Sequence, residues 1–274
     1  MKRIGIIYNP RTETAVNYSR EVEKILAAKN IQSWSCSAWE PEKARPQVPG
    51  SNLIITVGGD GTILRAAKAI VPEEVPILGI NLGKLGFMSE ITADEVSTKL
   101  TGFLNGDGWI EERAMLELRV ISQGITSYAL NDVFIGRRGS ARLVTIECKV
   151  EDELLTTYRA DGIIVATASG STGYALAAGG PILHPQARDI VLQPVSPHFS
   201  FDKPLVLSPE AVINFKVITT HEAMISIDGQ IEWQLDNGEL VEVKLSRYKS
   251  RFLRFQPENY FYGTLESKLN RKIS

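Results

Sequence analysis

The chain has 274 residues, of which 43% are hydrophobic and 23% are charged, and its formal net charge is −2. These values are typical of a soluble globular protein with one large domain or two of ordinary size, and the small charge argues against a nucleic-acid partner. No apolar run approaches the roughly 20 residues that span a bilayer, so we expect a cytoplasmic protein with no membrane partner.

The first 108 residues alternate strand-like and helix-like patterns, which predicts a Rossmann-like α/β domain with an open sheet. Residues 1–8 read as a first strand and not as a signal peptide. Residues 41–49 read as a polar connection with prolines. The expected strands are 3–8, 53–57 and 76–80, and the expected helices are 15–29, 62–70 and 93–104.

A glycine-rich turn, Gly58-Gly59-Asp60-Gly61-Thr62, joins the strand 53–57 to the next helix. Glycines admit a phosphate close to the backbone, and a helix N-terminus offers free N–H groups and a favourable dipole. Asp60 would repel a phosphate unless a cation bridges the two, which indicates metal-assisted phosphoryl chemistry. A second glycine-rich loop, 81–87, follows the third strand and would face the same crevice.

Residues 109–256 change to a β pattern, which predicts a β-rich, sandwich-like domain. A short helix, 173–180, is expected after a strand at 162–167, and Asp228-Gly229 reads as a hairpin turn. In the tail 257–274, a helix at 265–270 follows three aromatic residues that need covering, so the tail is expected to pack back on the N-terminal domain. Further strands are expected at 116–120, 144–150, 211–217 and 241–245.

Familiar motifs are absent from the sequence. Gly83-Lys84 is followed by leucine and not by the Ser or Thr of a Walker A loop, and the glycine turn lacks the third glycine of a dinucleotide fingerprint. Ser171 is not in a G-x-S-x-G elbow. Two isolated cysteines and three histidines without HxxxH spacing offer neither a disulfide framework nor a zinc centre.

Three polar clusters lie in the predicted β-rich domain. Asn131-Asp132 and Asp161-Gly162 are each most simply read as turns when taken alone. The segment 169–174, Ser-Gly-Ser-Thr-Gly-Tyr, is rarer, because its hydroxyls could bind a base or ribose and Tyr174 could give a stacking face.

Taken together and in this order, the motifs resemble those of the NAD kinase family, from the first strand to the tail at 260–269. The resemblance implies transfer of the γ-phosphoryl of ATP, or of polyphosphate, to the adenosine 2′-hydroxyl of NAD, giving NADP. It also implies a site between two domains, Mg²⁺ or another divalent cation held through the ATP phosphates, and a homo-oligomer (dimer or tetramer). Because the glycine turn also occurs in lipid kinases, the segment 169–174 is the discriminating part.

Carried onto this chain, the resemblance makes Asp60 the acceptor of the 2′-hydroxyl proton, with no protein ligand assigned directly to the metal. The implied phosphate and ATP contacts are Gly58, Gly59, Gly61, Thr62 and Arg65. The implied NAD contacts are Asp60, Gly61, Phe87, Asn131, Asp132, Arg142, Arg159, Asp161, Ser169, Thr172, Gly173, Tyr174, Ala175, Leu176, Ala177 and Gln230. Asp132 stands where the family often has glutamate, Gly173 where it often has alanine, and Met88 where it often has leucine or tyrosine.

Two other functions share parts of this pattern. A kinase for lipids or other small molecules would share the glycine turn, but the segment 169–174 argues against it. A non-catalytic sensor of NAD or NADP could use the same scaffold, but it would not need an intact Asp60. An assay with ATP, Mg²⁺ and NAD separates the three functions.

Overall fold

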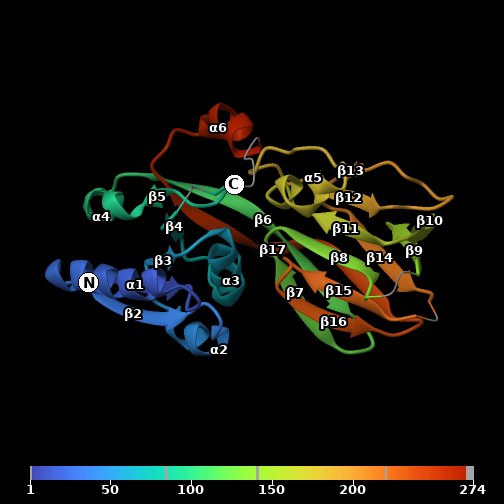
Figure 1. Ribbon diagram of the computed structural model, residues 1–274, viewed down its shortest axis with the longest axis horizontal. Helices are drawn as coiled ribbons and strands as arrows, with labels where there is room; N and C mark the ends of the chain where they lie inside the picture. The colour runs from blue at the N-terminus through green and yellow to red at the C-terminus, as the bar shows by residue number, and fades with distance from the viewer. Residues whose placement is uncertain (1, 84–85, 140–141, 220, 270–274) are drawn as a thin grey trace. The chain divides into compact units, whose positions relative to one another are not determined.

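The structure is a computed structural model that describes residues 2–83, 86–139, 142–219 and 221–269 (Figure 1). It divides into two compact units, of which unit 1 takes Met1–Glu112 and Ser250–Ser274 and unit 2 takes Arg113–Lys249. The predicted fold class, an α/β domain followed by a β-rich domain, is confirmed. The domain boundaries at residues 108 and 256 stay predictions, because the two compact units are not the same thing as functional domains. The packing of the tail on the N-terminal domain also stays a prediction.

The sheet of unit 1 is built on parallel strands in the order β4-β3-β1-β2. All residues of β3 and β4 are buried, as expected for a parallel sheet with both faces covered. A short strand, β5, and the C-terminal end of β17 both pair with β4. The strands are β1 (Arg3–Tyr8), β2 (Gln32–Ser37), β3 (Leu53–Val57), β4 (Ile77–Asn81), β5 (Ile91–Thr92) and β17 (Leu240–Arg254).

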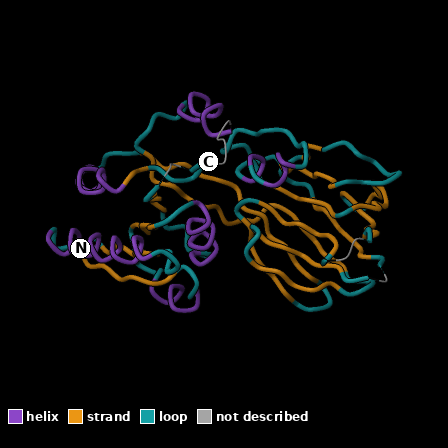
Figure 2. Tube along the Cα trace, in the orientation of Figure 1, coloured by secondary structure: helices purple, strands orange, loops and turns teal. Residues whose placement is uncertain are grey.

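Helices α1 (Glu13–Ala28) and α4 (Val96–Asn105) share an apolar core with this sheet. The helices are the purple segments in Figure 2. Helix α1 buries Ala15, Ser19, Val22 and Leu26, whose spacing of three and four residues defines one apolar face. Helix α3 makes a close approach, since a Cβ on Gly79 of β4 would lie 2.7 Å from Ile63 Cδ1. The helices are α1 (Glu13–Ala28), α2 (Pro41–Ala44), η1 (Arg45–Gln47), α3 (Asp60–Ile70), η2 (Ala93–Glu95), α4 (Val96–Asn105) and α6 (Tyr260–Leu269).

Several predicted elements of unit 1 need correction. The connection 41–49 contains the helices α2 and η1, because a proline is well tolerated in the first turn of a helix. Helix α3 begins at Asp60, so the carboxylate belongs to the helix and not to the turn before it. The three aromatics expected before the last helix lie inside α6, where Tyr262 is 66% exposed. Residue 270, the expected end of that helix, lies outside the described residues.

Unit 2 contains two layers of antiparallel strands that enclose one apolar core. In one layer the order is β10-β9-β14-β17, with β6 beside β17 and β7 beside β6; in the other it is β13-β12-β11-β8-β15-β16. The first layer has β6 (Trp109–Val120), β7 (Ile125–Ala129), β9 (Val144–Val150), β10 (Glu153–Ala160) and β14 (Val212–Val217). The second has β8 (Asp132–Arg137), β11 (Gly162–Ala166), β12 (Ile190–Val195), β13 (Leu205–Leu207), β15 (Ala223–Ile227) and β16 (Ile231–Leu235).

The hairpin predicted at Asp228-Gly229 is confirmed, because β15 and β16 pair on either side of it. Both residues have positive φ, 51° and 62°, a conformation that Asp and Gly tolerate well. The helical segment expected at 173–180 is shorter, and consists of η3 (Gly170–Thr172) followed by α5 (Tyr174–Ala177).

Candidate functional site

The glycine turn follows β3 and leads directly into helix α3. Gly58 has a φ of 152°, and a Cβ there would lie only 2.4 Å from Thr62 Oγ1, so this position requires glycine. Gly59, with a φ of −92°, is the N-cap of α3. Apart from its chain neighbours and the backbone of α3 itself, no described atom lies within 4 Å of a Cβ built on Gly59 or Gly61, and both residues are exposed. The turn therefore presents an accessible helix N-terminus, a suitable place for a phosphate.

The carboxylate of Asp60 is held by the loop that follows β4. Its Oδ2 accepts a hydrogen bond from the Phe87 amide at 2.8 Å. Its Oδ1 accepts from the Ser89 hydroxyl at 3.0 Å and, more weakly, from the amides of Ser89 at 3.3 Å and Met88 at 3.4 Å. These donors and the helix dipole stabilise the negative charge. A cation is therefore not the only partner for the charge of Asp60, since the loop itself supplies hydrogen-bond donors.

A buried ion network fixes this loop to the end of β17. Arg254 Nη1 donates to the Met88 carbonyl oxygen at 2.8 Å and lies 3.0 Å from Glu90 Oε2, while Nε lies 2.6 Å from Glu111 Oε2. The other oxygen of Glu90 accepts from the amides of residues 255 and 256 at 2.7 and 2.9 Å. The three charged side chains are nearly inaccessible to solvent, so the network is rigid. Sequence patterns did not single out any of them.

Arg65, predicted as a phosphate ligand, lies against an aromatic ring. Its guanidinium carbon is 4.2 Å from the centroid of Trp39, and the guanidinium carbon of Arg11 is 4.8 Å from the same ring. Burial, and then the charge of Arg11, lower the pKa of Arg65. Arg11 and Trp39 were missed, because they come from two different loops and the sequence does not show that these meet.

Phe87 donates its backbone amide to the Asp60 carboxylate, and the centroid of its ring lies 5.5 Å from Lys268 Nζ of α6. Met88 is 4% exposed, so its side chain belongs to the interior of unit 1.

In unit 2, Asp228 organises the segment that carries Asn131 and Asp132. Its carboxylate accepts hydrogen bonds from the amides of residues 130, 131 and 132 at 3.2, 2.8 and 3.1 Å, and its own amide donates to the Asp132 carbonyl oxygen at 2.9 Å. Sequence reasoning treated Asp228 only as a turn residue. The structure shows that it also fixes two of the predicted NAD contacts.

Asp132 is 8% exposed and lies close to the carboxylate of Asp228. Burial, and then the Asp228 charge, raise the pKa of Asp132 to about 7. Its protonation therefore changes near neutral pH.

The segment 169–174 packs tightly against Asn131. A Cβ on Gly170 would lie 2.1 Å from the Asn131 carbonyl oxygen, so the approach requires glycine. Ser171 is fully buried and structural, with its hydroxyl donating to the Ala168 carbonyl oxygen and accepting from the Leu183 amide. In contrast, Ser169 Oγ and Asn131 Oδ1 are buried atoms with no hydrogen-bond partner among the described residues. Two such atoms, one on each of these two packed segments, are suited to a polar ligand.

The rest of this segment offers a mixed surface. Tyr174 is 45% exposed, and its ring centroid lies 5.5 Å from that of Phe134 on β8. Gly173 and Ala177 are exposed, and Thr172 and Leu176 are half-buried. Ala175 is fully buried, so its side chain belongs to a small apolar cluster beneath α5.

The remaining predicted contacts of unit 2 are spread over several strands and loops. Asp161 Oδ1 forms an ion pair of 2.7 Å with Arg137 Nε, a partner that the sequence did not suggest. Arg142 Nη1 lies 3.3 Å from His221 Nε2, and Arg159 is exposed on β10. The amide of Gln230 donates to the Ile227 carbonyl oxygen at 2.9 Å, which closes the hairpin at Asp228.

Family comparisons match both halves of the chain. Residues 29–108 match the ATP-NAD kinase N-terminal domain, and residues 130–255 match the ATP-NAD kinase C-terminal domain. The chain belongs to the NAD kinase family. It is therefore a kinase, and the family resemblance of its motifs is confirmed.

Individual NAD kinases align over nearly the whole chain. An NAD kinase of Dehalococcoides mccartyi is 43% identical over 98% of this chain and 96% of its own length. One of Chloroflexus aggregans is 37% identical over 99% of both. Yeast NADH kinase, crystallised with NADH, has a TM-score of 0.83 and 25% identity, covering 100% of this chain and 89% of that one. An NAD kinase of Archaeoglobus fulgidus in complex with ATP has a TM-score of 0.77 and 26% identity, covering 97% and 98%.

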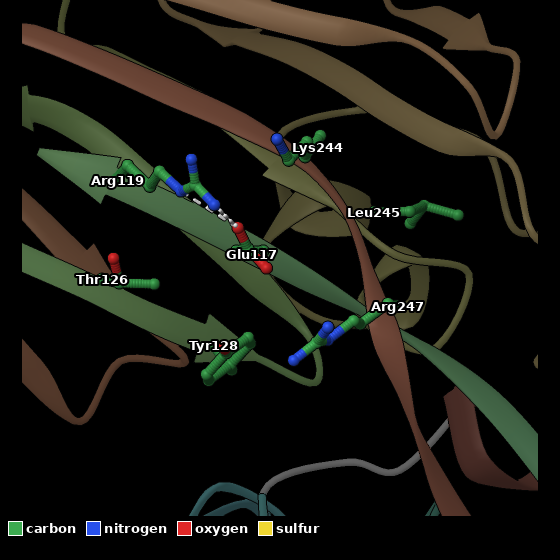
Figure 3. Close-up of a pocket in the computed structure, with 7 residues that line it drawn as sticks. All are labelled: Glu117, Arg119, Thr126, Tyr128, Lys244, Leu245 and Arg247. Carbon is green, nitrogen blue, oxygen red and sulfur yellow. Dashed lines mark hydrogen bonds and ion pairs between the residues drawn. The ribbon is translucent and has the colours of Figure 1, made fainter. Parts of the chain in front are cut away.

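A groove of about 430 Å³ on unit 2 contains none of the residues that the NAD kinase motifs predict (Figure 3). Arg119 and Glu117 form an ion pair of 2.9 Å in it. Tyr128, another lining residue, packs edge-on against Tyr248 with 5.6 Å between the ring centroids. The lining residues are Glu117, Arg119, Thr126, Tyr128, Lys244, Leu245 and Arg247.

Within the described ranges, no three His, Cys, Asp or Glu side chains are grouped so that they could hold a metal ion. Over the same residues, no helix has the length and apolar character needed to cross a membrane.

Proposed function

We propose that this kinase transfers the γ-phosphoryl group of ATP to the adenosine 2′-hydroxyl of NAD, with Asp60 as the residue that orients the hydroxyl and accepts its proton. The observation that carries the proposal is the position of Asp60. Its carboxylate is held in place at the N-terminus of α3, between two exposed glycines that leave room for phosphate groups. Family membership supports a role for this carboxylate in phosphoryl transfer to NAD.

The donor phosphates would bind to unit 1. The amides of Gly58 and Thr62 already donate to the carbonyl oxygens of Ile80 and Gly59, at 3.1 and 2.9 Å. The amides of Gly59 and Asp60, at the start of α3, are therefore the ones that would hold phosphate oxygens. Arg65 follows Gly61 by one helical turn and would add a positive charge. The ATP bound to the Archaeoglobus fulgidus enzyme supports ATP as donor here, while inorganic polyphosphate stays an alternative donor.

NAD would bind to unit 2 through the segments that Asp228 and Gly170 hold together. Asn131 Oδ1 and Ser169 Oγ are buried without a partner, and an adenosine group supplies donors for both. The exposed ring of Tyr174 offers a stacking face, and Asp161, Arg159, Arg142 and Gln230 would complete the contacts. The NADH bound to the yeast enzyme supports a nicotinamide dinucleotide as ligand.

The transfer would proceed in line, with the protein positioning both groups and neutralising charge. An ordinary carboxylate is a weak base toward a sugar hydroxyl, so Asp60 would take the proton late. Its Oδ1 already accepts three hydrogen bonds, whereas Oδ2 accepts one and keeps a lone pair. Oδ2 is therefore the atom that we assign to the hydroxyl.

A divalent cation, Mg²⁺ or a substitute, would come with the donor and neutralise its phosphate charges. Asp60 is the one acidic residue of the turn. Among the residues that the structure describes, no three His, Cys, Asp or Glu side chains are grouped to hold a metal, so we assign the ion to the phosphates. We further propose, on the family resemblance, a homo-oligomer (dimer or tetramer) in the cytoplasm.

One assay tests the function: purified protein with ATP, Mg²⁺ and NAD, followed by detection of NADP. We expect turnover. Turnover of a lipid but not of NAD would indicate a different kinase, and NAD binding without any turnover would indicate a sensor.

A further inference from the structure

Two positively charged groups share one aromatic ring beside the glycine turn. The guanidinium carbons of Arg11 and Arg65 lie 4.8 and 4.2 Å from the ring centroid of Trp39. Within the described residues neither guanidinium has a carboxylate partner, so the indole is the group that holds both. Ring and cation attract each other through the negative face of the aromatic system.

This arrangement leaves positive charge uncompensated. Burial, and then repulsion by the charge of Arg11, lower the pKa of Arg65. Proteins usually place arginines next to carboxylates, and a pair held together without one is suited to an external anion with several charges. Guanidinium groups match phosphate oxygens especially well, because their N–H donors form a planar fork.

Backbone contacts bring Arg11 and Arg65 next to the glycine turn. The amide of Arg11 donates to Asn9 Oδ1 at 2.9 Å, and the amide of Asn9 donates to the Val57 carbonyl oxygen at 2.9 Å. A Cβ on Gly58 would lie 3.2 Å from the Cβ of Asn9. Arg65 lies on α3, the helix whose N-terminus the turn forms. The cluster and the turn therefore belong to one surface of unit 1.

We propose that Arg11, Arg65 and Trp39 form a subsite for the phosphate chain of the donor, with the arginines binding the phosphates that are not transferred. Trp39 is a positioning residue that holds both guanidiniums in place. This inference rests on the proposed function and adds two residues, Arg11 and Trp39, to its donor site, where they would act on the phosphate chain and not on the adenine base. Inorganic tripolyphosphate should therefore bind to the protein without a nucleoside.

The first test is calorimetric titration of the whole protein with tripolyphosphate at fixed ionic strength. We expect binding to the wild type, a loss of at least tenfold in affinity for Arg11→Ala and for Arg65→Ala, and a smaller loss for Trp39→Phe, which keeps a ring. Arg45→Ala is the matched control, because Arg45 is an exposed arginine of the same unit outside the cluster. It should bind as the wild type does.

The second test separates donor from acceptor by steady-state kinetics. Arg11→Ala should raise the KM for ATP at least tenfold and leave the KM for NAD within twofold. If the KM for NAD rises instead, or if Arg45→Ala weakens tripolyphosphate binding as much as Arg11→Ala, the subsite is refuted. Absence of tripolyphosphate binding to the wild type also refutes it. Wild-type binding without any formation of NADP refutes the proposed function and leaves the subsite in place.

Discussion

A methyl group on Gly86 would lie 2.1 Å from Oδ1 of Asp60. The loop after β4 thus reaches the carboxylate only because residue 86 has no side chain. The same loop supplies the amide and hydroxyl donors that hold Asp60. Position 86 therefore controls where the proposed proton acceptor lies.

Replacing Gly86 by alanine should displace the Asp60 carboxylate and break hydrogen bonds from residues 87 and 89. Because a displacement of about 1 Å can cost about a hundredfold in rate, we expect kcat to fall at least tenfold. Gly83→Ala is the control in the same loop, since a Cβ there would lie 3.8 Å from Asn81 Oδ1, an ordinary contact. Steady-state kinetics of both variants, with thermal unfolding as a check of folding, tests this, and full activity of Gly86→Ala would contradict it.

Asp60→Asn keeps the shape of the side chain and removes its negative charge. We expect NADP formation to fall by about a hundredfold or more, the range typical of a lost general base, while NAD binding stays within about twofold. Activity is followed by NADP detection and binding by calorimetry. If a folded variant loses NAD binding together with activity, Asp60 serves to bind NAD and not to accept the proton.

Arg254 should matter for activity although it does not belong to the predicted site. Methionine there would remove the cation that pairs with the buried Glu90 and Glu111, a change that typically costs about 3–5 kcal/mol of unfolding free energy. Lysine keeps the charge but cannot contact both glutamates and the Met88 carbonyl oxygen in the same geometry. We expect Arg254→Lys to lower kcat more than it changes the KM for NAD.

The matched control for Arg254 is Arg251→Lys. Arg251 is in the same strand and pairs with Glu74 and Glu112, but its side chain is 38% exposed. Exposed pairs contribute at most about 1 kcal/mol, so this variant should behave like the wild type. Equal losses of kcat and of unfolding free energy in the two lysine variants would show that the buried network has no special role.

Sequence patterns predicted those elements whose signal is local. Strands β1, β3 and β9 have the predicted bounds, because their apolar residues are continuous or strictly alternate. Strand β2, Gln-Ser-Trp-Ser-Cys-Ser, was missed, because half of its residues are serine and its burial comes from neighbours. In the second layer, the sequence predicted β11 and the hairpin between β15 and β16, whereas β8, β12 and β13 were missed.

The residues of the candidate site were predicted one by one from the family resemblance. The contacts that hold these residues in place were not predicted. Asp228 bonds to amides 96 to 98 residues away, and Arg254 bonds to groups 143 to 166 residues away. No periodicity or spacing rule encodes such distances. The contact between Arg11 and Trp39 could not be predicted either, because the two residues lie in separate loops and no sequence pattern links them.

The carboxyl pair of Asp132 and Asp228 makes stability depend on pH. Burial and the neighbouring charge raise the pKa of Asp132 from 3.8 to about 7 in the folded state. Between these two values the folded chain binds the proton more readily than the unfolded chain, so the folded state is stabilised at low pH. This contribution is lost as pH rises toward 7, at up to about 1.4 kcal/mol per pH unit.

Asp132→Asn should remove this dependence, because the amide does not ionise. Urea unfolding at pH 5, 6, 7 and 8 should show a free energy of unfolding that falls less steeply with pH in the variant than in the wild type. At pH 8, where the wild type holds two adjacent carboxylates, the variant should be the more stable protein. Asp202→Asn, an exposed aspartate in the same unit, is the control and should follow the wild-type curve. Parallel curves for all three proteins would show that Asp132 does not titrate between pH 5 and 8.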